Sequence, residues 1–156
     1  MPEFDAIRSL FLAKTVAVVG ASASPEKTGY VILKNIIDGG YQGRVYPVNP
    51  KAESILGVPC VASLADIPGE VDLVVVVVPA KAVPEVMRQA AAKGVKGAVI
   101  ISGGFREIGN AELEAEVIGI ARDAGIAVIG PNCQGINYLP NRLCASWPLL
   151  DVEGPI

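Results

Sequence analysis

The segment at residues 18–29, VVGASASPEKTG, has the composition of a phosphate-binding loop. After Gly20 it offers the hydroxyls of Ser22 and Ser24, the charge of Lys27 and the backbone N–H groups of an expected helix start. Such N–H groups, together with the helix dipole, bind anions. The segment lacks the G-x-G-x-x-G spacing of dinucleotide-binding loops, so it indicates a phosphate without identifying the ligand. The structural alternative is a plain turn in which a hydroxyl caps the helix.

The residues after the second expected strand narrow the choice of ligand. An NAD-binding protein places Asp or Glu here, and the carboxylate binds the ribose 2′-hydroxyl. This chain reads VNPK instead, from Val48 through Asn49 to Lys51. A lysine favours an additional phosphate, which both NADP and coenzyme A carry on the adenosine ribose. The structural alternative is a solvated lysine that follows a turn proline.

Two further loops offer a surface for an apolar or extended ligand. Pro79, in VPAK, can pack on an adenine or a pantetheine, although a tight strand-to-helix turn explains it equally well. The segment SGGF combines Ser102 with Gly103 and Gly104, whose backbone allows close approach of a ligand. Phe105 ends this segment, and we expect it to be exposed.

A last loop, GPNC, spans Gly130, Pro131, Asn132 and Cys133. The chain contains no histidine, which excludes a Ser-His-Asp triad, a Cys-His dyad, a histidine zinc site and a phosphohistidine within it. We therefore interpret Cys133 as a packing thiol rather than a nucleophile. Glu107 can act as an acid or a base, but a charge at the solvated rim is the simpler interpretation. We assign no catalytic residue and no metal ligand.

Apolar runs alternate with helical patterns along the chain, which is typical of βαβ units. The most hydrophobic run, 72–78, is expected to be a central strand, and 58–61 an edge strand that tolerates Pro59. The pattern predicts a doubly wound, Rossmann-like α/β sheet of about six parallel strands in three αβα layers, in the order 3-2-1-4-5-6. All five loops described above then lie at one edge of this sheet. The expected strands are 15–19, 44–48, 58–61, 72–78, 97–101 and 126–129, and the expected helices are 30–40, 83–94 and 111–124.

Bulk properties exclude several functional classes. The net charge of −3 and the pI near 5.0 argue against nucleic-acid binding. There is no run of 18 apolar residues and no signal-peptide pattern, so we expect no membrane association. Three widely spaced cysteines predict reduced thiols in the cytoplasm. The mean hydropathy of +0.46 fits either a buried sheet or apolar surface that packs on absent domains.

Taken together, the five loops resemble the N-terminal CoA-binding domain of the ADP-forming acyl-CoA synthetases and, more distantly, the α subunit of succinyl-CoA synthetase. The resemblance extends from about Leu10 to Trp147, and the ordered set is more specific than any one motif. The matching stretches are VAVVGASASPEKTGYVILKNI, RVYPVNPKAESILG, DLVVVVVPAKAVPEV, GAVIISGGFREIG and GPNCQGI.

The resemblance implies that coenzyme A lies along the strand ends. Ser22, Ser24 and Lys27 would belong to the first ligand loop. Val48, Asn49 and Lys51 would meet the adenosine and its phosphates. Pro79 and residues 102–105 would line the path of the nucleotide and pantetheine, and residues 130–132 would lie nearer the thiol.

In these enzymes acyl-CoA, ADP and phosphate are interconverted with the free acid, CoA and ATP. The phosphohistidine and the ATP-grasp module lie in other domains. Residues 1–156 are therefore expected to form a single domain, the N-terminal part of a longer chain cut near LLDVEGPI, that binds CoA or acyl-CoA without turning it over.

Two alternatives remain open at this point. The first is a regulatory CoA-binding module of a protein acetyltransferase, or a stand-alone CoA-binding protein, although the intact GPNCQGI motif argues against the stand-alone form. The second is an NADP-binding oxidoreductase domain, which shares the fold but requires a glycine fingerprint that this chain lacks.

Overall fold

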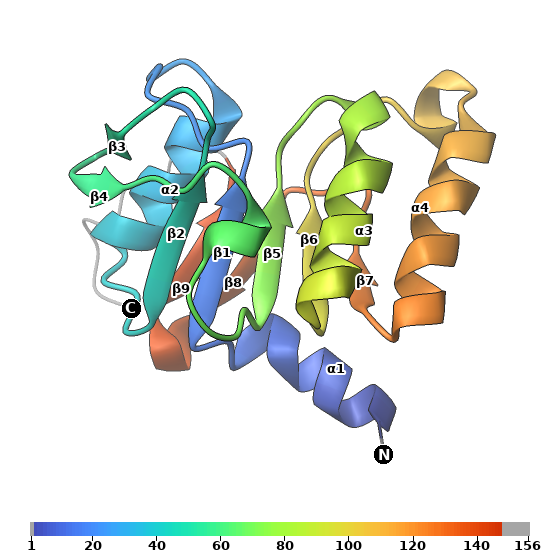
Figure 1. Cartoon of the computed structure of the whole chain (residues 1–156), viewed down its shortest axis with the longest axis horizontal. Helices are drawn as coiled ribbons and strands as arrows, with labels where there is room; N and C mark the ends of the chain where they lie inside the picture. Colours follow the sequence, from blue (N-terminus) through green and yellow to red (C-terminus); the bar gives the residue numbers. More distant parts are fainter. Residues whose placement is uncertain (1, 148–156) are drawn as a thin grey trace.

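A computed structural model of the chain describes residues 2–147 (Figure 1). The expected C-terminal domain boundary at LLDVEGPI lies outside these residues. No helix in the described part has the length and apolarity to cross a membrane. The elements along the chain are α1 (Pro2–Phe11), β1 (Thr15–Val19), α2 (Thr28–Asp38), β2 (Arg44–Val48), β3 (Ser54–Ile55), β4 (Val58–Pro59), η1 (Leu64–Asp66), β5 (Leu73–Val76), η2 (Ala80–Ala82), α3 (Val83–Lys93), β6 (Gly97–Ile100), η3 (Arg106–Ile108), α4 (Ala111–Ala124), β7 (Ala127–Ile129), β8 (Gly135–Tyr138), η4 (Leu139–Asn141) and β9 (Leu143–Ser146).

The central sheet is parallel and has five strands in the order β2-β1-β5-β6-β7. This confirms the doubly wound fold class. β5 is the middle strand, and every residue from Leu73 to Val76 is fully buried, as the apolar run predicted. Between β1 and β5 the chain changes direction across the sheet, and such switch points are where doubly wound folds bind ligands.

The third expected strand, at 58–61, does not join this sheet, which therefore has five strands rather than six. β4 pairs antiparallel with β3, and only Val61 reaches β2, through a single parallel bridge to Val48. The Val61 N–H donates to the Pro47 carbonyl, so the backbone polar groups of residue 47 point away from β1, toward the open side of β2. Because proline has no N–H to donate in that direction, the pairing between β2 and the 58–61 segment does not extend further.

Two layers cover the sheet (Figure 1). Helices α3 and α4 pack together over one face and bury a core that includes Val76, Met87 and Val117. The opposite face is covered by α1, α2 and the antiparallel hairpin β8–β9, around Ile32, Leu33 and Ile36. The three expected helices are thus confirmed, but α1 and the β8–β9 hairpin were not predicted.

The β8–β9 hairpin is fixed by contacts with residues distant in sequence. The buried side chain of Asn35 in α2 donates from Nδ2 to the carbonyl of Ser146, at 2.9 Å. The Asn141 side chain donates to the carbonyl of Phe11 at the end of α1, at 2.8 Å. The hairpin therefore ties the two helices of this layer together.

Candidate functional site

Because the five strands are parallel, the loops that follow them all leave the sheet at one edge. The loops at this edge contain all the predicted site residues, and the structure divides these loops into two groups. One group surrounds a cavity at the ends of β1, β2 and β5. The other group lies at the ends of β6 and β7.

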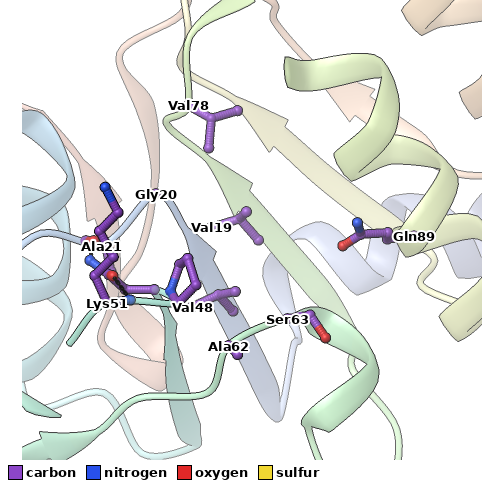
Figure 2. A pocket seen from close by; sticks show the side chains of 11 residues that line it. Val19, Gly20, Ala21, Val48, Lys51, Ala62, Ser63, Val78 and Gln89 are labelled. Atoms are coloured by element: carbon purple, nitrogen blue, oxygen red, sulfur yellow. Dashed lines mark hydrogen bonds between the residues drawn. The ribbon is translucent and has the colours of Figure 1, made fainter. Parts of the chain in front are cut away.

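The cavity has a volume of about 290 Å³ and lies at the switch point between β1 and β5. Four predicted residues line it: Gly20, Val48, Asn49 and Lys51. Figure 2 shows Gln89 of α3 approaching from the side opposite Lys51, with valine side chains between them. The remaining lining residues, which the sequence analysis missed, are Val19, Ala21, Pro50, Ala62, Ser63, Val78 and Gln89.

Two glycines let the loop after β1 pack closely against the segment after β5 and against α2. Gly20 has φ +96° and lies so close to the backbone of Val77 that an added Cβ would be 2.8 Å from its carbonyl. A Cβ on Gly29 would lie only 2.1 Å from the carbonyl oxygen of Gly20. The glycines therefore serve close backbone packing, in addition to any approach of a ligand.

The outer part of this loop has donors available for an anion. The Ser22 hydroxyl accepts a hydrogen bond from the N–H of Ser24 at 3.1 Å, which shapes the turn. Within residues 2–147, no protein acceptor meets the backbone N–H groups of Ala21, Ser22 and Ala23. Lys27 directly precedes α2 and is exposed. Ser22, Ser24 and Lys27 do not line the cavity but extend the same loop beyond it.

Asn49 joins the loops after β1 and β2. Its side chain donates from Nδ2 to the carbonyl of Ala21, at 2.8 Å. Its Oδ1 accepts from the N–H groups of Lys51, at 2.8 Å, and Ala52, at 3.2 Å. The Asn49 amide is therefore engaged inside the protein, and it positions Lys51 at the cavity.

We expect the substitution Asn49→Ala to lower the free energy of unfolding by about 2 kcal/mol, because three hydrogen bonds are lost and partly buried backbone groups lose their partner. Urea denaturation followed by circular dichroism measures this change. Gln134→Ala is the control, since Gln134 is exposed and contributes only its backbone carbonyl to a hydrogen bond. Equal stability of the two variants would contradict the positioning role of Asn49.

The second group is held together by backbone contacts between the loops after β6 and β7. The N–H of Asn132 donates to the carbonyl of Ser102 at 3.0 Å, and Gly103 lies beside the Asn132 side chain. Gly130, with φ +98°, passes so close to β6 that a Cβ there would be 2.2 Å from the Ile100 carbonyl oxygen. Pro131 follows it through a cis peptide bond.

The Ser102 side chain connects this second group to the cavity. Its hydroxyl donates to the carbonyl of Val78 at 2.5 Å, and Val78 lines the cavity. Pro79, the next residue, is exposed at the same edge, and Gly104 lies against Ala80. The two groups are therefore neighbouring parts of one continuous edge.

The expected exposure of Phe105 was wrong. Its side chain is completely buried, in the core beneath α3 and α4. A ligand at the surface does not reach the ring, which anchors the glycine loop from below. The sequence shows a phenylalanine after two glycines, and only the packing of the helices decides which way the ring points.

Cys133 is partly buried, and its thiol donates to the carbonyl of Ile100 at 3.4 Å. Burial raises the pKa of this thiol, so the thiolate is disfavoured. These features support the interpretation of Cys133 as a packing thiol.

Among the missed lining residues, Ser63 and Gln89 carry polar side chains. Ser63 donates from its hydroxyl to Asp66 at 2.8 Å, at the start of η1. Gln89 lies in the middle of α3, where a helical pattern gives no indication of a ligand. Of these two residues, only Ser63 belongs to a recognisable sequence pattern. The S-x-x-D spacing at residues 63–66 indicates a helix start rather than a binding site.

Comparison with known proteins gives consistent matches. Residues 14–138 match the family described as CoA binding domain. The chain is 47% identical over 148 residues to acetate–CoA ligase (ADP-forming) II of Archaeoglobus fulgidus, covering 94% of this chain and 22% of that protein. It is 44% identical over 157 residues to the α subunit of acetate–CoA ligase (ADP-forming) I of Pyrococcus furiosus, covering 96% and 34%.

The fold matches a solved structure of a similar protein. This is the dinucleotide forming acetyl-coenzyme A synthetase 1 of Ca. Korarchaeum cryptofilum, in complex with phosphate and ADP. The TM-score is 0.87 at 41% identity, and the match covers 94% of this chain and 31% of that one. The chain therefore spans about a fifth to a third of the length of these relatives.

Proposed function

The chain belongs to the family of CoA-binding domains, and we propose that it serves as the CoA-binding domain of an ADP-forming acyl-CoA synthetase. The observation that carries the proposal is the cavity at the β1–β5 switch point, which has Lys51 at the end of β2 in place of an acid. The match to the family supports the binding of CoA. The overall reaction given below is proposed from the relatives.

The cavity fits the adenosine part of CoA. Its wall is mainly apolar, with valine and alanine side chains, and it carries the polar groups of Asn49, Ser63 and Gln89. Lys51 lies at its border and is exposed, so its ammonium group can reach a ribose phosphate. The unpaired N–H groups of residues 21–23 and the Lys27 side chain are suited to the diphosphate.

We propose that the pantetheine extends from the cavity toward β6 and β7. Gly103 is exposed there and presents its bare backbone to an extended chain, and the exposed Asn132 offers a carboxamide. The residues of this chain bind and orient CoA, and CoA itself supplies the reactive thiol. The proposed phosphoryl transfer passes through a phosphohistidine, which this chain cannot supply because it contains no histidine.

The proposed overall reaction converts acyl-CoA, ADP and phosphate into the free acid, CoA and ATP. The partners would be a domain carrying the phosphohistidine and an ATP-grasp domain, in the same chain or in another subunit. The lengths of the relatives support this division. A cytoplasmic location is supported by the three free cysteines.

Calorimetric titration of the chain with CoA, dephospho-CoA, NADP and NAD tests the ligand. We expect CoA to bind, dephospho-CoA to bind about tenfold more weakly because one phosphate contact is lost, and NAD not to bind. Binding of NADP without CoA would overturn the proposal in favour of an oxidoreductase domain. Equal affinity for CoA and dephospho-CoA would remove the role proposed for Lys51.

A further inference from the structure

The loop after β6 is held by a carboxylate that accepts hydrogen bonds only from the backbone. Glu107 Oε1 accepts from the N–H of Gly104, at 2.5 Å, and from that of Phe105, at 3.2 Å. The Gly104 hydrogen bond is the main reason that the pKa of the Glu107 carboxyl is lowered. No cation pairs with Glu107 in the described part of the chain, and the neighbouring Arg106 pairs with Glu114.

Further contacts fix the rest of the loop. Asn110 donates from Nδ2 to the carbonyl of Gly104, at 3.3 Å, and from its backbone N–H to the carbonyl of Phe105, at 2.9 Å. The buried ring of Phe105 anchors the loop to the core. Glu107 is thus the group that holds the outer, exposed part of a loop whose inner part is already fixed.

The resulting shape brings Gly103 close to two polar side chains. A Cβ added to Gly103 would lie 3.1 Å from Asn132 Oδ1 and 3.2 Å from Glu107 Oε1, which is tighter than an ordinary contact. The absence of a side chain therefore lets the loop after β6 lie close to Asn132 in the loop after β7. The hydroxyl of Ser102 donates to the carbonyl of Val78, so this loop is also bonded to the wall of the cavity.

Lysines lie at the loops after β1 and β2, where Lys27 and Lys51 are exposed and favour the phosphates of a ligand. At the loops after β5 and β6 the charges are mixed, because Lys81 and Arg106 are exposed there as well as Glu107. The role of Glu107 therefore rests on its hydrogen bonds rather than on its charge.

We propose that Glu107 is a positioning residue for CoA, which acts by holding the Ser102–Phe105 loop in place beside Asn132. This inference rests on the proposed function of the edge as a CoA site. Glu107 contributes as a hydrogen-bond acceptor for the N–H groups of Gly104 and Phe105. Glu107 accordingly affects the affinity for CoA through the shape of the Ser102–Phe105 loop.

Two substitutions separate this role from a general effect on stability. Glu107→Ala removes the acceptor, and we expect CoA affinity to fall about tenfold, as for the loss of hydrogen bonds to a charged group. Glu107→Gln keeps an acceptor oxygen at the same position and is expected to restore affinity to within about threefold of the original chain. Glu112→Ala, a change of an exposed acid at the start of α4, is the matched control and should leave affinity unchanged.

The measurements are calorimetric CoA titration, thermal melting and amide hydrogen exchange by NMR. The amides of Gly104 and Phe105 are expected to exchange faster in Glu107→Ala than in the original chain. A lower melting temperature with unchanged CoA affinity, or equal weakening by Glu107→Gln and Glu107→Ala, would overturn the inference. Failure of the original chain to bind CoA would instead overturn the proposed function, and the inference with it.

Discussion

Replacing Gly29 with alanine is expected to lower the melting temperature by about 10 °C, because the added methyl group collides with the backbone of the ligand loop. The new Cβ would lie 2.1 Å from the carbonyl oxygen of Gly20 and 3.2 Å from Cα of Ala21. Neither atom belongs to a flexible side chain, so α2 must move away from the loop. Overpacking of this kind costs about 3 kcal/mol, at the upper end of the usual range.

The same substitution is expected to weaken CoA binding, because Gly20 and Ala21 line the cavity. Differential scanning calorimetry and CoA titration measure the two effects. Gly119→Ala is a matched control, since Gly119 also lies inside a helix and has nothing within 4 Å of the added Cβ. We expect that variant to melt at the same temperature or slightly higher. If Gly29→Ala melted at the same temperature as the original chain, α2 and the loop could separate without a loss of stability, which would contradict the prediction.

Reversing the charge of Lys51 with Lys51→Glu is expected to weaken CoA binding about a hundredfold. An attractive contact with the ribose phosphate is lost, and a repulsive one replaces it. Dephospho-CoA lacks this phosphate, so its affinity is expected to change by only about threefold. Titration of both ligands against the original chain and the variant forms a cycle that isolates the contact between Lys51 and the phosphate.

Lys96→Glu is the control for long-range charge effects, because Lys96 precedes β6 at the opposite edge of the sheet and is also exposed. It alters the net charge by the same amount, and we expect it to leave both affinities nearly unchanged at physiological salt. If Lys51→Glu weakened CoA and dephospho-CoA equally, the lysine would instead contact the diphosphate that both ligands share.

The sequence by itself was sufficient to predict the main sheet and the edge at which ligands bind. The apolar run from Leu73 to Val76 and the alternation of strand and helix patterns reflect local burial, which each segment carries in its own composition. Parallel strands then bring the following loops to one edge, and Lys51 lies at that edge because of its place in the chain. This is why the family resemblance, which depends on these loops, was confirmed.

Contacts between distant segments decided what the sequence analysis missed. Phe105 is buried because α3 and α4 close over it, and the third expected strand is reduced to one bridge because Pro47 presents no donor on the outer edge of β2. Gln89 reaches the cavity only through the way α3 packs on the sheet.

Two further features depend on side-chain hydrogen bonds to the backbone of the loops. The amide of Asn49 is engaged with Ala21, and the carboxylate of Glu107 with Gly104. Residue type and spacing show that such side chains can bind a ligand or a backbone group, and only the positions of the surrounding atoms determine which partner they have. Local patterns thus determined the elements and the order of the loops, while the tertiary structure decided which side chains face the ligand and which hold the site in shape.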